Sequence, residues 1–132
     1  ACIDSSSYTS KLILKYRQFV INIIGKNTMR DLIYCGKVSG SDTDKFSKTK
    51  LKPVKSKTIK PPYIKESIGH IECSLYYRKE FEGVNLFVGS VKYCEVDEKY
   101  YDGNLISEKA KTPHHLGSRI FFFSGRRIKV GE

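Results

Sequence analysis

The sequence predicts a mainly β domain, either an α+β fold or a β-barrel with a few short helices. Segments rich in Ile, Val, Tyr and Phe dominate the second half of the chain, and helical periodicity is confined to short stretches in the first half. Strands and helices do not alternate regularly, as they would in βαβ units. The 132 residues, 39% of them hydrophobic, can bury one sizeable core, so we expect a single domain over residues 1–132.

The first half predicts two helices with a strand between them. Apolar residues recur at helical spacing over residues 10–20, and the Ser and Thr run at residues 5–10 supplies hydroxyl groups that can cap this helix. Residues 19–24 are largely β-branched, which favours a strand that ends at Gly25. A second helix is expected at residues 29–36. Residues 37–67 show no strong periodicity, and such a long loop in a small domain is either disordered or part of a functional site.

The second half predicts three strands, at residues 68–78, 85–95 and 119–123, which pair antiparallel. Glu82 and Gly83 form the turn between the first two. Residues 101–104 form another turn, and residues 124–125 close a terminal hairpin. Cys73 and Cys94 alternate with apolar neighbours, so both are expected to pack in the core as free thiols.

Several classes of function lack support in the sequence. The nucleotide fingerprints G-x-G-x-x-G and G-x-x-x-x-G-K-[ST] and the G-x-S-x-G elbow do not occur, and the four cysteines lack C-x-x-C spacing, so we predict no metal site. The longest apolar stretches are far shorter than the roughly 20 residues that span a membrane, and no signal peptide is evident. We therefore expect a cytoplasmic protein without a membrane partner.

The net charge of +10 raises the question of a nucleic-acid partner. Nine lysines fall within residues 37–65, among Ser, Thr and Pro, which is typical of a solvated loop, so nucleic-acid binding is not expected to be the main function. Two histidines, His114 and His115, are adjacent. From an extended strand they cannot both face one site, so either one of them lines a pocket or both flank a loop after Pro113.

Two segments offer groups suited to an anionic ligand. The hydroxyl and amide groups at the start of the first helix can bind a phosphate, although helix capping explains the same residues equally well. Residues 39–46 combine a flexible glycine, hydroxyls, one cation and one aromatic ring, which suits a phosphorylated aromatic ligand. A solvated turn uses the same residue types, and both interpretations stay open.

Short stretches along nearly the whole chain follow a recognisable order of motifs. Residues 7–13 resemble S-Y-T-x-x-L-I, residues 19–23 resemble F-V-V-N-I, and residues 35–46 resemble C-G-x-x-S-G-x-x-x-D-K-F. Further stretches resemble L-x-P-V, L-E-C and L-F-I-G, at residues 51–54, 71–73 and 86–89. In order and spacing, this set of stretches resembles the flavin reductase-like and flavoredoxin family.

This resemblance implies a Greek-key split β-barrel that binds FMN at a homodimer interface. It implies that Thr9 and Lys45 contact FMN, with Lys45 offsetting negative charge and Thr9 donating or accepting a hydrogen bond. It implies Ser7, Ser39 and Gly40 as further, weaker FMN contacts, because a capping or turn role would suffice for each of them. Phe46 is either a core residue or a wall of the ligand site.

Two departures from the family pattern bear on the cofactor. The family's first strands would precede Ala1, so the resemblance implies a barrel that is incomplete at its N-terminus. Val84 and Asn85 stand where many members have H-T before L-F-I-G.

Three functions follow as hypotheses. The leading one is an FMN-dependent oxidoreductase that moves electrons from NAD(P)H or a protein donor to an acceptor, without an identified catalytic residue. The second is a non-catalytic dimeric interaction module that has lost flavin binding. The third is binding of a polyanion by the lysine-rich loop.

Overall fold

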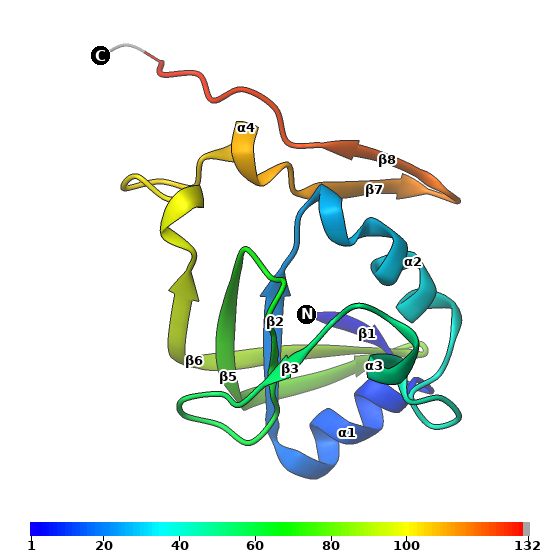
Figure 1. Cartoon of the computed structure of the whole chain (residues 1–132). Coiled ribbons are helices and arrows are strands. Elements are labelled where there is room, and N and C mark those ends of the chain that lie inside the picture. The colour runs from blue at the N-terminus through cyan, green and yellow to red at the C-terminus, as the bar shows by residue number, and fades with distance from the viewer. Residues whose placement is uncertain (131–132) are drawn as a thin grey trace.

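A computed structural model describes residues 1–130. Its centre is a four-stranded antiparallel sheet in the order β1-β6-β5-β2 (Figure 1). The strands of this sheet are β1 (Cys2–Asp4), β2 (Gln18–Ile23), β5 (Gly69–Phe81) and β6 (Val84–Val96). β5 and β6 form the long hairpin that the sequence predicts, with its turn at Glu82 and Gly83; Gly83 has a φ of 85°.

The first helix, α1 (Tyr8–Tyr16), is capped as predicted, because the Ser7 side chain accepts a hydrogen bond from the Ser10 amide. It is shorter than the expected 10–20 segment. Arg17 adopts a left-handed conformation with a φ of 57°, and the chain enters β2 at Gln18, where pairing with β5 replaces helical bonds. The strand β1 has no counterpart in the sequence prediction.

The second helix, α2 (Met29–Lys37), confirms the expected 29–36 segment and follows the short turn η1 (Lys26–Thr28). Residues 37–67 are more structured than predicted. They contain the short helix α3 (Lys45–Lys48) and the strands β3 (Pro53–Val54) and β4 (Tyr63–Ile64), which pair with each other. In Figure 1 this segment passes in front of β2.

The last part of the chain corrects two predictions. After η2 (Glu98–Tyr100) and α4 (Ser107–Ala110), the strands β7 (Pro113–Gly117) and β8 (Ile120–Phe123) pair only with each other within the described residues. The predicted 119–123 strand therefore does not join the main sheet. The hairpin closes at Ser118, which has a φ of 51°, and not at residues 124–125. His114 and His115 lie on β7, where they stack on Phe122 and Phe121.

The main core lies between α1 and the sheet. It consists of Ile13, Phe19, Cys73, Leu75 and Phe87, with Ile3 and Ile71 packed against it. The expectation for Cys73 is confirmed, since only 2% of its surface is exposed, but Cys94 is exposed and the prediction of a core role for it is wrong. β6 turns this residue away from the core. Among residues 1–130, no helix has both the length and the apolar character to cross a membrane.

Candidate functional site

Four of the six predicted ligand contacts line one pocket between α1 and α3. This α1–α3 pocket has a volume of about 380 Å³, and its lining includes Tyr8, Thr9, Leu12, Gly40, Asp44, Lys45, Phe46 and Thr49. Thr9 and Lys45, which are 36 positions apart in the sequence, thus meet at one place. Ser7 and Ser39 are not among its lining residues.

Lys45 is the cation of the α1–α3 pocket. Its ammonium group donates a 2.6 Å hydrogen bond to the Cys35 carbonyl oxygen near the end of α2, which holds the half-buried side chain in place. An ammonium group has three donors, so two remain for a ligand. Gly40 allows this arrangement, because a Cβ atom there would lie 3.3 Å from the Tyr8 ring and 3.8 Å from Lys45 Cε.

The other predicted residues have local roles that the structure makes explicit. The Ser7 hydroxyl caps α1, and the Ser39 hydroxyl contacts the Ser41 hydroxyl at 2.7 Å and accepts a bond from the Ser41 amide. Asp44 caps α3 by accepting from the amides of Phe46 and Ser47. Its carboxylate therefore occupies the amides that an anion could otherwise bind at the start of that helix.

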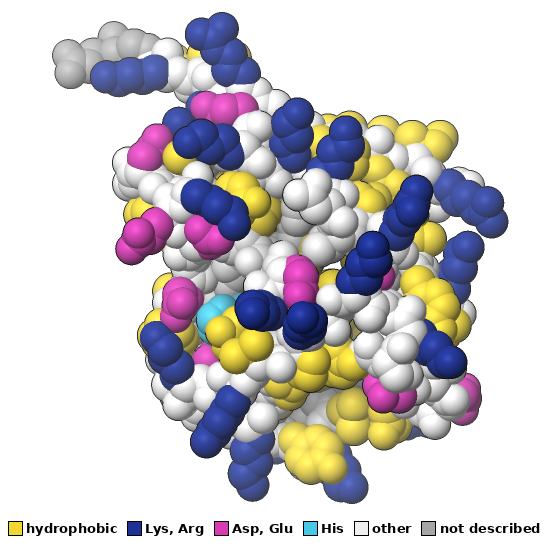
Figure 2. All heavy atoms as spheres, viewed as in Figure 1, with side chains coloured by type: hydrophobic (Ala, Val, Ile, Leu, Met, Phe, Trp, Pro, Cys, Tyr) yellow, Lys and Arg dark blue, Asp and Glu magenta, His cyan; other side chains and the backbone are white. Residues whose placement is uncertain are grey.

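A larger, mostly apolar hollow adjoins this pocket along α1. This α1–β2 hollow has a volume of about 770 Å³ and shares Thr9, Leu12 and Phe46 with the α1–α3 pocket. Its lining also includes Ile3, Ile13, Val20, Lys60, Pro61 and Pro62. Phe46, 40% exposed, is thus a wall of both spaces and not a core residue. Hydrophobic side chains gather on the lower half of the face in Figure 2, over α1 and the segment in front of β2.

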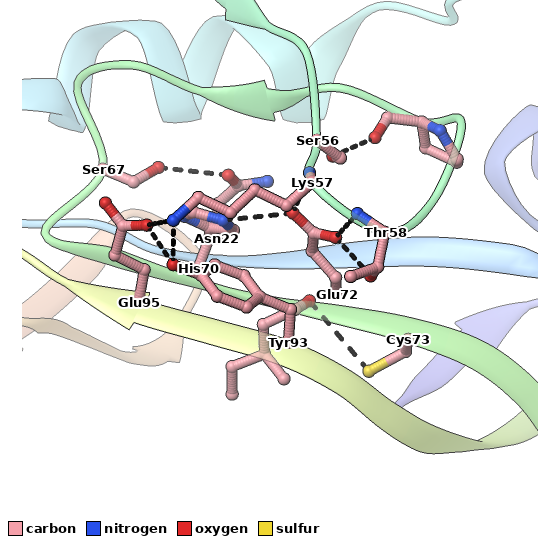
Figure 3. A network of polar contacts seen from close by, with 12 residues as sticks. Asn22, Ser56, Lys57, Thr58, Ser67, His70, Glu72, Cys73, Tyr93 and Glu95 are labelled. Carbon is pink, nitrogen blue, oxygen red and sulfur yellow. Dashed lines mark hydrogen bonds and ion pairs between the residues drawn. The ribbon is translucent and has the colours of Figure 1, made fainter.

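The segment that carries Lys60, Pro61 and Pro62 is held against the sheet by polar side chains (Figure 3). The Glu72 carboxylate on β5 accepts bonds from the amides of Lys57 and Thr58 at 2.8 and 2.7 Å and from the Thr58 hydroxyl at 2.6 Å. The Gln18 side chain on β2 accepts from the Lys60 amide at 3.0 Å. The Asn22 side chain accepts from the Ile64 amide at 2.8 Å and from the Ser67 hydroxyl.

Glu72 is fully buried, yet its pKa lies below the ordinary value. Burial raises the pKa of a carboxyl group, but here the bonds from Thr58 and Lys57 outweigh that effect and favour the ionised form. His70 Nε2 lies 3.4 Å from Glu72 Oε1 and, among the described residues, has no hydrogen-bond partner. Its ring stacks on Tyr63 with the centroids 4.0 Å apart.

The sequence alone assigned no role to Gln18, Asn22 or Glu72. It also assigned none to residues 60–62, which form one wall of the α1–β2 hollow and are called the 60–62 wall below. The available signal was Glu72 itself, an acidic residue directly between Ile71 and Cys73 in a predicted strand. A charge at such a position needs buried partners, but nothing local in the sequence says where those partners are.

Comparison with known proteins decides the family. The model of the flavin reductase like domain matches residues 1–111. The chain belongs to this family. An uncharacterized protein of Pyrococcus abyssi is 36% identical over 95 residues, which is 72% of this chain and 54% of that protein. One of Archaeoglobus fulgidus is 32% identical over 101 residues, covering 76% and 57%. The chain thus spans little more than half the length of these relatives.

Solved structures agree on the flavin reductase-like fold. Flavoredoxin of Desulfovibrio vulgaris (Miyazaki F) superposes with a TM-score of 0.85 at 25% identity, covering 97% of this chain and 70% of that one. A putative flavin reductase with a split barrel domain from Shewanella frigidimarina gives 0.88 at 16% identity, covering 99% and 68%. An FMN-binding protein from Thermus thermophilus gives 0.83 at 19%, covering 99% and 71%. The predicted mainly β split barrel is therefore confirmed.

Proposed function

We propose that this flavin reductase-like chain binds FMN in the α1–α3 pocket and the adjoining α1–β2 hollow. The observation that carries the proposal is that Thr9 and Lys45 line one pocket, which shares Thr9, Leu12 and Phe46 with a larger, mostly apolar hollow. FMN combines a charged phosphate, which suits the cation Lys45, with a flat ring system, which suits the apolar hollow. Volumes of several hundred Å³ suit ligands of this size.

The residues present fit the cofactor. Lys45 retains two donors, Thr9 is exposed, and Lys60 adds a second cation to the lining of the hollow. Lys45 offers charge-assisted hydrogen bonds to a phosphate in the α1–α3 pocket, and the neighbouring Asp44 carboxylate requires the phosphate to lie on the Lys45 side. The faces of Leu12, Phe46, Pro61 and Pro62 offer apolar contact to a ring.

The proposed activity is that of an FMN-dependent oxidoreductase of the flavin reductase type. Bound FMN would supply the transfer of electrons from NAD(P)H or a protein donor to an acceptor. The chain's own residues bind and orient the cofactor: Lys45 neutralises negative charge, and Thr9 fixes a polar edge by a hydrogen bond. The FMN-binding protein of Thermus thermophilus, which shares the fold, and the flavoredoxin of Desulfovibrio vulgaris support this proposal.

A homodimer is the second part of the proposal. Large apolar side chains are exposed on the outer half of the β5–β6 hairpin, with Tyr76 77%, Tyr77 51% and Phe81 48% exposed. Side chains on the C-terminal hairpin, such as Leu116 and Ile120, are also exposed. Apolar surface of this kind is typical of protein interfaces and favours a second copy of the chain as the partner. Sedimentation velocity tests this part, and a monomer at micromolar concentration would contradict it.

Titration of the purified protein with FMN, followed by flavin fluorescence and by the visible absorption bands, tests whether the chain binds FMN at the proposed site. We expect about one FMN per chain, with roughly tenfold weaker binding in Lys45→Ala, since one charge-assisted hydrogen bond is lost. Thr9→Ala should weaken binding by a smaller factor. Lys48→Ala is the matched control, because Lys48 lies on the same short helix but is not among the lining residues of the pocket. Equal affinities in all four proteins would contradict the proposed site.

A further inference from the structure

The segment that forms one wall of the α1–β2 hollow cannot be held by an ordinary strand ladder. Pro61 and Pro62 have no amide hydrogen, so they cannot donate to a neighbouring strand. The amides elsewhere in the segment, several of them partly buried, still need acceptors. In this fold the acceptors are side chains that rise from the sheet: Glu72 for Lys57 and Thr58, Gln18 for Lys60, and Asn22 for Ile64.

Glu72 is the most demanding of these acceptors. It is 0% exposed, and neither Lys nor Arg pairs with it among residues 1–130. A buried carboxylate is costly unless several donors satisfy it, and here three donors from two consecutive residues converge on its two oxygens. A carboxylate accepts at both oxygens and donates at neither, so no other side chain of similar size replaces it at this turn.

The contacts bracket the wall on both sides. Before it, Glu72 fixes the turn at Lys57 and Thr58. After it, Tyr63 stacks on His70 with the ring planes 4° apart, and Asn22 holds the Ile64 amide. Ser56 also donates to the Pro61 carbonyl oxygen, so the turn and the wall are joined directly. Figure 3 shows Glu72 and Asn22 reaching from neighbouring strands to this one segment.

We propose that Glu72 is a positioning residue for the α1–β2 hollow, where FMN is proposed to bind. By fixing the turn at Lys57 and Thr58, Glu72 sets where Pro61 and Pro62 lie and therefore how wide the hollow is. This inference rests on the proposed function. It assigns an effect on cofactor affinity to a buried residue that lines neither the α1–α3 pocket nor the α1–β2 hollow.

The test compares Glu72→Gln with Glu95→Gln in the full chain. Gln keeps the size of Glu, but its NH₂ group must face one of the three donors and leave it unpaired. Glu95 is the matched control, because it lies on the same sheet and bonds the Lys57 ammonium, but it does not contact the turn amides. Three quantities are measured: the FMN dissociation constant, the shape of the visible bands of bound FMN, and hydrogen exchange of the amides in residues 55–64 without FMN.

We expect Glu72→Gln to exchange faster at residues 55–64 and to bind FMN roughly tenfold more weakly, with altered bands, while Glu95→Gln matches the wild type. Equal FMN binding in wild type and Glu72→Gln would overturn the positioning role and leave the proposed function intact. A wild type that binds no FMN would instead overturn the proposed function, and the positioning role with it.

A second pair of variants keeps the test decisive if Glu72→Gln does not fold. Thr58→Val removes only the hydroxyl donor to Glu72, and Thr58→Ser keeps it. We expect weaker FMN binding in Thr58→Val and restored binding in Thr58→Ser. Identical affinities in these two variants would again contradict the inference.

Discussion

Asn85 Nδ2 donates a 2.7 Å hydrogen bond to Ser10 Oγ, joining β6 to α1 across 75 positions of sequence. Both side chains are buried, and the Asn85 oxygen accepts a 2.6 Å bond from Arg78 Nε. We expect Asn85→Ala to lower the free energy of unfolding by about 2–3 kcal/mol, because it leaves the Ser10 hydroxyl and Arg78 Nε without these partners and opens a cavity. Urea denaturation measures this value. Ser6→Ala, at an exposed hydroxyl, is the control, and an equal loss there would contradict the prediction.

Gly89 lies where the sheet meets the core. A Cβ atom at this position would come within 2.7 Å of Phe19 Cζ and 2.8 Å of Cys73 Cβ. Gly89→Ala should therefore lower the unfolding free energy by about 1–3 kcal/mol through overpacking. Gly36→Ala is the matched change, since within residues 1–130 no atom beyond its own helix turn and chain neighbours lies within 4 Å of a Cβ there, and it should leave stability unchanged or raise it by up to about 1 kcal/mol. Thermal melts of both variants test this prediction. A Gly89→Ala protein as stable as the wild type would contradict it and show that Phe19 and Cys73 can move to accommodate the added methyl group.

The ionised state of Glu72 makes stability depend on pH. Its pKa is lower in the folded chain than the ordinary 4.5, so its contribution is fully present above pH 4.5 and is lost as the pH falls through the lower, folded value. We expect the difference in melting temperature between wild type and Glu72→Gln to be largest near neutral pH and to shrink in this acidic range. A difference that stays constant from pH 7 down to pH 3 would mean that the carboxylate is not the group responsible.

The thiols of Cys2, Cys73 and Cys94 should differ in reactivity. Cys73 is buried, and burial raises the pKa of its thiol, whereas Cys2 and Cys94 are exposed. A thiol reagent such as 5,5′-dithiobis(2-nitrobenzoate) should label Cys2 and Cys94 quickly in the native protein and Cys73 only after denaturation. The variant Cys2→Ser/Cys94→Ser identifies the fast phase, which it should abolish. One common rate for all thiols would contradict the described core.

The elements with a local signal were predicted well from the sequence. The Ser7 cap, the helix at residues 29–36 and the β5–β6 hairpin each depend on neighbours in the chain, and all three are confirmed. The strand β1 has only three residues and no periodicity of its own, and it exists because it pairs with β6. The terminal hairpin was assigned the wrong turn, although Gly117 and Ser118, both with positive φ, carried the correct signal.

The candidate site could be predicted only in part. Thr9, Gly40, Lys45 and Phe46 were found through family resemblance, and the structure brings them to one pocket, while their contact with FMN stays a prediction. The 60–62 wall and its supports at Gln18 and Glu72 were missed. Those supports act over 14 to 42 positions of sequence, and no short-range pattern encodes which amide a distant side chain will accept from.

The sheet order β1-β6-β5-β2 has a consequence for the folding pathway. The β5–β6 hairpin closes across a two-residue turn, whereas the pairing of Gln18 with Ser74 requires a long stretch of chain to be brought together first. We expect the hairpin to form part of the transition state and β2 to dock afterwards. Leu75→Ala should then slow refolding, and Ile21→Val should mainly accelerate unfolding, in stopped-flow measurements across a range of urea concentrations. On this pathway the wall of the hollow assembles last, because its supports on β2 and β5 come together only when β2 docks.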